Sequence, residues 1–330
     1  MEGFIVMGIL RRVGAFSIFI ATLSVGNVLA NQSNDLLVAM EAGRCVPQAE
    51  KLHKMALMGD ALSQLAFGQA ASKNLCGVVE MGKEFSFYWY RKSAEQGNAI
   101  AQAALGKHLA TSWVREDEEE SLIWYQRAAD QGNADGKFGL AQLYGRPRAW
   151  SKKIPHSDEL AMKLYHEAAS QGHELSYFVL SQIYENGSNG VEKNDAIAAQ
   201  WYRKAADNGS SFAQSQLAQR FQEGRGVDQS DAEARRWYGK SAAQGNAYAQ
   251  TSLAKMYRDG SGGLRDESMA LQLFIKSAEE GESNAQFELG RMYLLGLGGV
   301  PQSRSKAEHW FAKSAERWHP LAIKELENLR

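Results

Sequence analysis

A nine-residue motif that recurs eight times constrains the fold of this chain more than any other feature. It reads WYRKAADNG at 201–209, WYRKSAEQG at 89–97, WYQRAADQG at 124–132, LYHEAASQG at 164–172, WYGKSAAQG at 237–245 and LFIKSAEEG at 273–281, with degenerate copies at 52–59 and 310–318. The copies close at positions 59, 97, 132, 172, 209, 245, 281 and 318, at intervals of 35 to 40 residues. Self-similarity at such a period is the signature of a solenoid, whereas a catalytic site is built once per domain, so the motif is interpreted as architecture.

The residues after each closing position carry a second pattern. Counted from the closing residue as zero, position +4 is small (Ser63, Ala101, Gly136, Ser176, Ala213, Ala249, Ala285) and position +8 is large and apolar (Phe67, Leu105, Leu140, Leu180, Leu217, Leu253, Leu289). Residues four apart share one helix face, so each repeat is expected to begin with a helix, here called helix A. The motif itself predicts a second helix, helix B, on which Trp201, Ala205 and Ala206 would share the packed face.

Glycine-rich loops follow the helices A of the later repeats. Glycine readily adopts the left-handed conformation that ends a helix, and it stands at the expected ends as Gly187, Gly224, Gly260 and Gly296. Because the G-x-G pattern recurs without a preceding strand, helix termination is favoured over phosphate binding. Acidic residues are then expected to supply capping oxygens near the start of helix B, at Asp195, Asp231 and Asp266.

The stretch AQSQLAQRFQEGRGVDQSDAEARRWYGKSAAQGN at 213–246 resembles a Sel1-like repeat, a relative of the tetratricopeptide repeat. The family pattern A-x-x-x-L-G-x-x-Y, G-x-G-V and A-x-x-W-Y-x-K-A-A-x-x-G matches in order, and the resemblance covers residues 48–330. It implies an all-α, right-handed α/α solenoid of about seven helix-turn-helix units, with a leading half-unit and a C-terminal capping helix. The second unit lacks the glycine loop, the third has a long insertion, and Trp318 replaces the last closing glycine.

Residues 1–30 have the layout of a secretory signal peptide. MEGFIVMGILRR ends in two arginines, VGAFSIFIATLSVG is an uncharged apolar run, and VLA precedes the expected cleavage after Ala30. A membrane-spanning helix needs about 20 apolar residues, so cleavage is favoured over the alternative of an uncleaved anchor. The mature chain is then expected to start at Asn31 with a lead-in at 31–47, and to be periplasmic or secreted, without stable membrane insertion.

Two cysteines, Cys45 and Cys76, are expected to pair in an oxidising compartment. Cys45 falls near the start of one predicted helix and Cys76 just past the end of the next, and those ends are neighbours in an antiparallel pair. A disulfide there would stabilise the fold by roughly 3–4 kcal/mol on the chain-entropy model. The alternative is two free thiols.

Charge and histidine placement give no support to nucleic-acid binding or catalysis. Without Glu2, Arg11 and Arg12 the net charge is −2, so no strong field attracts nucleic acid or an anionic membrane. The histidines are scattered over different units, and neither an HExxH motif nor a nucleophile elbow is present. His166 and His173, seven residues apart, are a weak indication of a metal site. We therefore expect no enzyme activity, no cofactor and no metal.

The helix A positions that the repeat does not dictate are candidate binding residues. Positions +3 and +6 are often apolar and position +10 is an amide or a cation; these residues are Ile100, Phe138, Leu175, Phe178, Phe212, Tyr248 and Phe287, with Lys107, Gln142, Gln182, Gln219, Lys255 and Arg291. Aromatic residues and arginine are favoured interface anchors, so this band is predicted to bind a partner protein in a groove lined by helices A. The alternative is that position +6 packs against the neighbouring repeat.

The insertion GRPRAWSKKIPHSDE at 145–159 is a second candidate surface. Trp150 lies among Arg146, Arg148, Lys152 and Lys153, a combination suited to an acidic partner. The alternative is a solvated loop whose tryptophan folds back on the scaffold. The acidic run REDEEE at 115–120 is interpreted as the first turn of a helix B, where carboxylates meet the positive end of the helix dipole, with a cation or basic-partner site as the alternative.

These observations favour an exported protein-binding scaffold, monomeric on its own. Its partner would be a toxin effector or an envelope protein, and the specific form we favour is an immunity-type inhibitor of a toxin that acts in the periplasm. A periplasmic regulator, an envelope-assembly factor and a secreted factor that contacts host cells fit the same features. A peptidoglycan-associated enzyme or cell-wall binder is the alternative of a different class.

Overall fold

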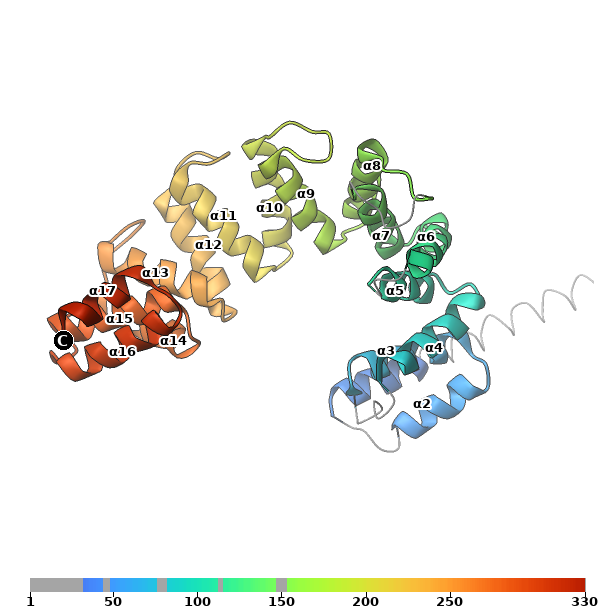
Figure 1. The fold of residues 1–330 in the computed structure, drawn as a ribbon, viewed down its shortest axis with the longest axis horizontal. Coiled ribbons are helices and arrows are strands. Elements are labelled where there is room, and N and C mark those ends of the chain that lie inside the picture. The colour runs from blue at the N-terminus through green and yellow to red at the C-terminus, as the bar shows by residue number, and fades with distance from the viewer. Residues whose placement is uncertain (1–31, 44–47, 76–81, 112–114, 147–152, 330) are drawn as a thin grey trace, which may run out of the picture. The chain divides into compact units, whose positions relative to one another are not determined.

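The computed structural model describes residues 32–43, 48–75, 82–111, 115–146 and 153–329, and every regular element in these ranges is a helix (Figure 1). Residues 32–41 form a helix, and it is followed by α2 (Gln48–Leu57), α3 (Ala61–Ser72), α4 (Gly82–Glu95), α5 (Ala99–Ala110), α6 (Arg115–Asp130), α7 (Ala134–Tyr144), α8 (Asp158–Ser170), α9 (Glu174–Asn186), α10 (Asp195–Asp207), α11 (Ser211–Glu223), α12 (Asp231–Ala243), α13 (Ala247–Asp259), α14 (Glu267–Glu279), α15 (Ser283–Leu295), α16 (Arg304–Glu316) and α17 (Pro320–Asn328). No helix in these ranges is long and apolar enough to cross a membrane.

Some of the predictions from sequence fall outside the described residues. These are the signal peptide, the Cys45–Cys76 disulfide, and the insertion residues Arg148, Trp150 and Lys152. They stay predictions.

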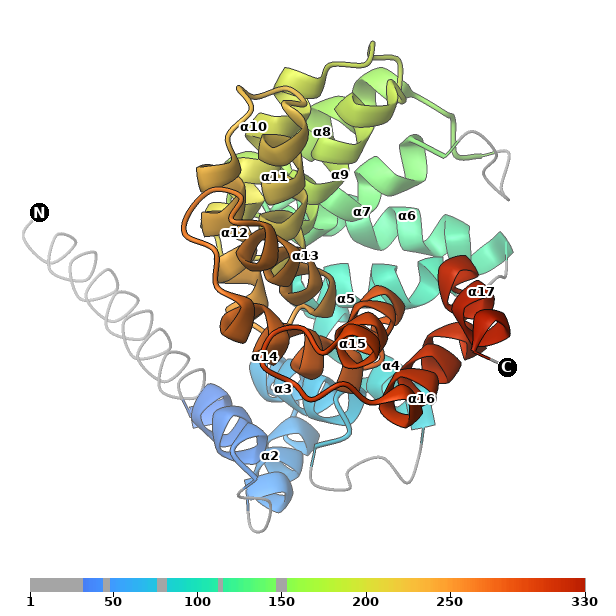
Figure 2. The ribbon, with the colours of Figure 1, turned by 90° about the vertical axis from the view of Figure 1, so that its left-hand side faces the viewer.

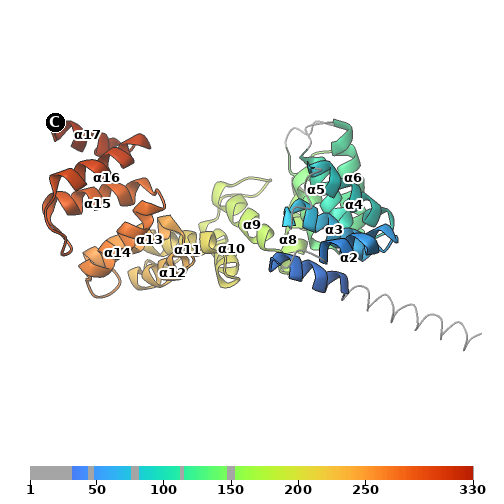
Figure 3. The same cartoon turned by 90° about the horizontal axis from the view of Figure 1, so that it is seen from below.

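The chain divides into two compact units, Met1–His173 and Glu174–Arg330. In the first unit each helix from α2 to α8 packs on the next, and α5 also packs on α7 (Figure 2). In the second unit the same order holds from α9 to α17 (Figure 3). The odd-numbered helices from α3 on are the predicted helices A and the even-numbered ones the helices B. The prediction of an all-α repeat solenoid is therefore confirmed.

The nine-residue motif is buried between helices, as its repetition predicts. In the copy at 201–209, Tyr202 is only 2% exposed and shares the packed face with Ala205 and Ala206, which are buried too. Trp201 is half-buried and stacks on Tyr177 of α9, with ring centroids 6.0 Å apart, so in this copy the tryptophan lies at the edge of the joint and Tyr202 lies deeper. The Lys204 ammonium group lies over the tryptophan ring, 4.1 Å from its centroid. The tryptophan thus supports a cation–π contact at the edge of the joint.

The equivalent tyrosine of the first unit, Tyr125, lies in a slot lined by glycines. A Cβ atom at Gly139 would come within 2.2 Å of its ring, and one at Gly106 within 2.9 Å. Both glycines lie inside helices, on α7 and α5 respectively. Because neither carries a side chain, both helices can pack closely against the ring on α6.

Buried glutamines join successive repeats through a chain of hydrogen bonds. In five repeats the side chain at position +5 donates to a carbonyl of the preceding helix B: Gln64 to Ala56, Gln102 to Ala94, Gln214 to Ala206, Gln250 to Ala242 and Gln286 to Ala278, at 3.0–3.4 Å. The glutamine before a closing glycine then donates to that side-chain oxygen, in the pairs Gln96–Gln64, Gln131–Gln102 and Gln244–Gln214, each at 2.8 Å. We call this series the glutamine ladder. Lys137 and Tyr177 replace its +5 glutamine on α7 and α9.

The helix ends carry the predicted types of residue, except that two capping residues lie one position earlier than predicted. The glycines that end the later helices A are left-handed, with φ of 68°, 66°, 72° and 69° at Gly187, Gly224, Gly260 and Gly296. Asp266 caps α14 by accepting a hydrogen bond from the Met269 amide. The predictions for Asp195 and Asp231 are one residue late, because Asn194 and Ser230 are the capping residues of α10 and α12.

The first packed helix begins earlier than the sequence indicated. Residues 32–41 belong to the predicted lead-in, yet Leu37 and Met40 are buried in one cluster with Leu52, Phe67 and Trp89. The helix at 32–41 therefore shares a hydrophobic cluster with α2, α3 and α4.

Candidate partner-binding surfaces

Position +3 carries exposed apolar side chains on the helices A of the second unit. Leu175, Phe212 and Tyr248, on α9, α11 and α13, are 53%, 46% and 42% exposed. Half-buried Phe178 meets Phe212 edge to face, with ring centroids 5.3 Å apart. We call these four residues the A-face ladder. In the first unit the exposed apolar residue at this position is Ile100.

Position +6 belongs mainly to the packed interior. Phe287 is buried, with its ring centroid 5.7 Å from that of Phe311 and 4.7 Å from that of His319. Its assignment to a binding groove is therefore corrected, because neighbouring rings already cover it. Phe138 is half-buried against Tyr165 and His173. Of the three phenylalanines predicted at this position, Phe178 is the one that adjoins an exposed apolar residue.

Position +10 supplies a polar border to the apolar band. Lys107, Gln142, Gln182 and Arg291 are exposed, and Gln219 and Lys255 are half-buried. The Gln219 amide donates to Glu223 one turn further along α11, at 2.7 Å. The border is neutral on α9 and α11, and it becomes basic on α13 and α15.

The flanks of the insertion at 145–159 are held by the acidic run on α6. Arg146 lies 3.3 Å from a carboxylate oxygen of Glu118, and Lys153 lies 2.6 Å from one of Glu119. Ile154, next to this lysine, is 4% exposed and anchors the chain. In the sequence analysis, the basic insertion and the acidic run are two separate candidate sites. They neutralise each other at these two pairs, and the run forms the first turn of α6 as predicted.

Ion pairs also shift pKa values on the scaffold. Arg91 donates two hydrogen bonds, of 2.6 and 2.9 Å, to Glu120 and so holds the pKa of that carboxyl below its ordinary value. His173, 3.2 Å from Asp135, lowers the pKa of that aspartate through a hydrogen bond. Each pair joins neighbouring repeats. Within the described part of the chain, no group of three His, Cys, Asp or Glu side chains is placed to hold a metal ion.

Seven segments of the chain match the family model described as Sel1 repeat, at residues 83–98, 99–133, 134–173, 175–210, 211–246, 247–282 and 283–317. These segments cover well over half of the sequence. The chain belongs to the Sel1 repeat family. Sel1 repeats mediate protein–protein interactions, so the coarse assignment as a protein-interaction scaffold holds.

Solved structures of other Sel1 repeat proteins resemble this chain along most of its length. A protective antigen of uropathogenic Escherichia coli with this fold is 31% identical, covers 90% of the chain and aligns with a TM-score of 0.70, and the chain spans 63% of that protein. A Sel1 repeat protein from Oxalobacter formigenes is 26% identical, covers 93% of the chain and is itself 90% covered, with a TM-score of 0.62. A chitin synthase regulator of Saccharomyces cerevisiae is 41% identical over 56 residues, which are 17% of this chain and 8% of that protein.

The Sel1 repeats of the second unit enclose a buried arginine that sequence reasoning missed. Arg220 on α11 is fully buried, 2.7 Å from a Glu185 carboxylate oxygen and 3.4 Å from one of Asp195. Its guanidinium lies over the Tyr202 ring, whose hydroxyl donates to Glu185 and whose pKa burial raises to about 12. Arg225, half-buried, lies 3.1 Å from the same glutamate. Alignment of the repeats with one another could have identified this arginine, because the same position carries apolar residues in other repeats: Leu143, Ile183, Met256 and Met292.

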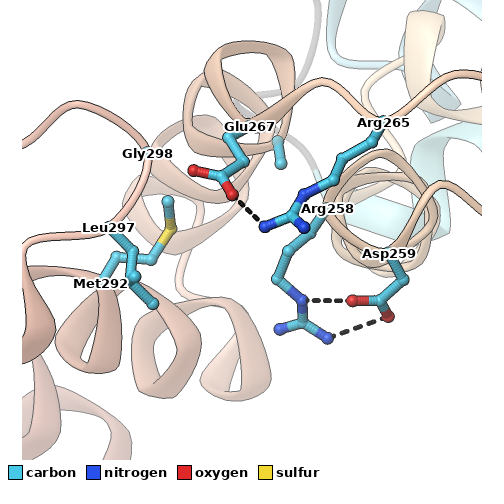
Figure 4. A pocket seen from close by; sticks show the side chains of 8 residues that line it. Arg258, Asp259, Arg265, Glu267, Met292, Leu297 and Gly298 are labelled. Atoms are coloured by element: carbon cyan, nitrogen blue, oxygen red, sulfur yellow. Dashed lines mark hydrogen bonds and ion pairs between the residues drawn. The ribbon is translucent and has the colours of Figure 1, made fainter.

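A cavity of about 400 Å³ lies between α13, α14 and the loop after α15 in these repeats (Figure 4). The charged residues that line it pair among themselves, Arg258 with Asp259 and Arg265 with Glu267. Met292 and Leu297 form an apolar wall opposite them. With its charges paired in this way, the cavity offers space for an apolar side chain and no chemistry of its own.

Proposed function

We propose that this chain is an exported scaffold that binds a segment of a partner protein on the helix A face of residues 174–330. The observation that carries the proposal is the A-face ladder, in which three successive helices A expose a large apolar side chain. Scattered surface apolar residues are ordinary, but large apolar side chains exposed at the same position of successive helices, with a polar border, are typical of an interaction site. Aromatic residues such as Phe212 and Tyr248 are also common binding hot spots.

In its finer form, the proposal is that the partner is a toxin effector and the chain an immunity-type inhibitor of it. Two features support this form. The predicted signal peptide would place the chain in the periplasm, where such a toxin would act. Inhibition also requires only that the scaffold cover its target, which a binding surface can do without catalytic groups.

The test compares capture of partners by the mature chain, residues 31–330, with capture by the double variant Phe212→Ser/Tyr248→Ser. Both side chains are nearly half exposed, so the variant is expected to unfold at the wild-type temperature. Hot-spot truncations cost about 2 kcal/mol or more each, so a protein retained from envelope extracts by the wild type should be lost. Ile100→Ser is the matched control, because it removes an equally exposed apolar residue from the other unit.

Equal recovery of the same protein by the wild type and the double variant would contradict the proposed surface. For the immunity form, the captured protein should arrest growth when it is directed to the periplasm alone. Growth should return when the wild-type chain is co-expressed, and it should not return with the double variant. A captured protein that leaves growth unchanged in the periplasm would exclude that form.

A further inference from the structure

Three cations converge on one buried carboxylate between α13 and α15. Glu288 Oε2 lies 2.9 Å from Arg258 Nη1 and 3.3 Å from Arg291 Nη1, and Glu288 Oε1 lies 4.0 Å from Lys255 Nζ. The Glu288 side chain is only 11% exposed, whereas those of Lys255 and Arg291 are 41% and 46% exposed. The positive charges of Lys255 and Arg291 therefore reach the surface, whereas the carboxylate that they share is buried.

Lys255 and Arg291 retain hydrogen-bonding capacity. Arg258 engages Asp259 through Nε and Nη2 and Glu288 through Nη1, so its donors are largely used. Arg291 contacts the shared glutamate through one nitrogen at 3.3 Å, although a guanidinium has five N–H donors. The Lys255 ammonium group lies beyond hydrogen-bond length from Glu288, at 4.0 Å. With three cations against two carboxylates, the group has room for one further negative charge.

This basic group continues the A-face ladder. Tyr248 and Lys255 are seven residues apart on α13, which places both on one helix face. The corresponding positions of α9 and α11 carry Gln182 and Gln219. The helix A face of this unit is thus apolar and neutral over α9 and α11, and basic over α13 and α15.

We infer that Lys255 and Arg291 bind a carboxylate of the partner segment whose apolar side chains lie on the A-face ladder. This inference rests on the proposed function and adds the chemistry of the partner: large apolar residues followed or preceded by Asp, Glu or a chain terminus. A single negative charge matches the net charge of the group, and a carboxylate fits the planar donor pair of a guanidinium. A phosphate dianion would face repulsion from Glu288 and Asp259.

The probe for the inference is a random dodecapeptide library displayed on phage with free C-termini and panned against the mature chain. Peptides selected by the wild type should be enriched in both aromatic or aliphatic residues and carboxylates. With Lys255→Met/Arg291→Met the enrichment in carboxylates should vanish while that in apolar residues remains. With Phe212→Ser/Tyr248→Ser the apolar enrichment should be lost. The methionine substitutions keep the apolar stems of both side chains, so the fold is expected to persist.

The two proposals fail in different ways. Selection of no peptide by the wild type would contradict the proposed function. Apolar peptides without an excess of Asp, Glu or a terminal carboxylate would overturn this inference and leave the proposed function standing. Selection for phosphorylated residues cannot occur in this library, so synthetic phosphopeptides of the same sequences provide that comparison; tighter binding of the phosphopeptide than of the aspartate peptide would also overturn it.

One selected peptide is then used in a double-mutant cycle. Its Asp→Asn version should bind the wild type about tenfold more weakly, as expected for the loss of a hydrogen-bonded charge. On Lys255→Met/Arg291→Met the two peptides should bind alike, and on the control Lys276→Met, at an exposed lysine of helix B α14, the tenfold difference should remain. Fluorescence anisotropy at low and high salt gives the affinities. An undiminished Asp-to-Asn difference on the double variant would overturn the inference.

Discussion

The joint around Tyr125 in the first unit and the joint around Tyr202 in the second use the same position of the repeat but different chemistry. In the first unit Tyr125 fits a slot that Gly106 and Gly139 leave open, so the joint is steric. In the second unit the equivalent Tyr202 lies under the buried guanidinium of Arg220, which is paired with carboxylates, so the joint is ionic. Both place an aromatic ring from helix B between helices A. The repeat pattern thus determines which positions come into contact. The residues that the pattern leaves variable determine which interaction stabilises the contact.

The ionic joint should be the more sensitive of the two. Arg220→Ala would remove a fully buried side chain and its ion pairs to Glu185 and Asp195. Because Glu185 keeps Arg225 and the Tyr202 hydroxyl as partners, the cost is expected at the lower end of that of breaking a buried ion pair, about 3 kcal/mol. Arg225→Ala is the matched control, because this half-exposed arginine pairs with the same glutamate and is expected to cost about 1 kcal/mol or less. Urea unfolding of the mature chain gives both free energies. Equal costs for the two substitutions would show that burial does not set the strength of this joint.

The steric joint should respond to a single methyl group. Gly139→Ala would force its Cβ into the Tyr125 ring, and overpacking of this kind destabilises by about 1–3 kcal/mol. Gly239→Ala provides the control, because that helical glycine on α12 has no atom within 4 Å of the added Cβ. There the better helix propensity of alanine should stabilise the chain by about 0.5–1 kcal/mol. If both variants shifted the unfolding temperature in the same direction, the interpretation that Gly139 leaves space for the Tyr125 ring would be contradicted.

Sequence periodicity determined the fold almost completely. The period near 36 residues, the small residue at +4 and the glycines that end helices A predicted the helix pairs, because each states a local requirement of packing or backbone conformation. The errors arose where two residue types can meet the same requirement. Either ring of the Trp201–Tyr202 pair could fill the joint, and either Asn194 or Asp195 could cap α10. One sequence offered no means to choose between them.

The candidate surface was predictable only in part, because exposure depends on neighbours distant in sequence. Exposed Leu175, Phe212 and Tyr248 were in the predicted band, but so was Phe287, which Phe311 and His319 cover from the next repeat. The pairing of Arg146 and Lys153 with the acidic run was equally hidden, since the charges are about 30 residues apart in sequence. Periodicity identifies the face of a helix, and only the assembled repeat shows what remains uncovered.

The glutamine ladder, which both units share, offers the smallest and sharpest test. Glu280 occupies the position of the donors Gln96, Gln131 and Gln244, and an ionised carboxylate cannot donate a hydrogen bond. Its would-be acceptor, the buried Gln250 Oε1, has no hydrogen-bond partner among the described residues. Glu280→Gln should therefore complete the ladder and raise the free energy of unfolding by about 1 kcal/mol.

A control separates this hydrogen bond from the simple loss of a negative charge at a helix C-terminus, which is itself stabilising by about 0.3–1 kcal/mol. Glu279→Gln removes a neighbouring exposed charge from the same end of α14, at a position off the ladder. The reverse change, Gln244→Glu, removes the donor to Gln214 and should cost about 1–3 kcal/mol, because a buried amide oxygen loses its partner. If Glu280→Gln stabilises no more than Glu279→Gln, the dipole accounts for the gain and the ladder ends at Gln244. If Glu280→Gln stabilises the chain more than Glu279→Gln, one added N–H donor extends the glutamine ladder by a further repeat.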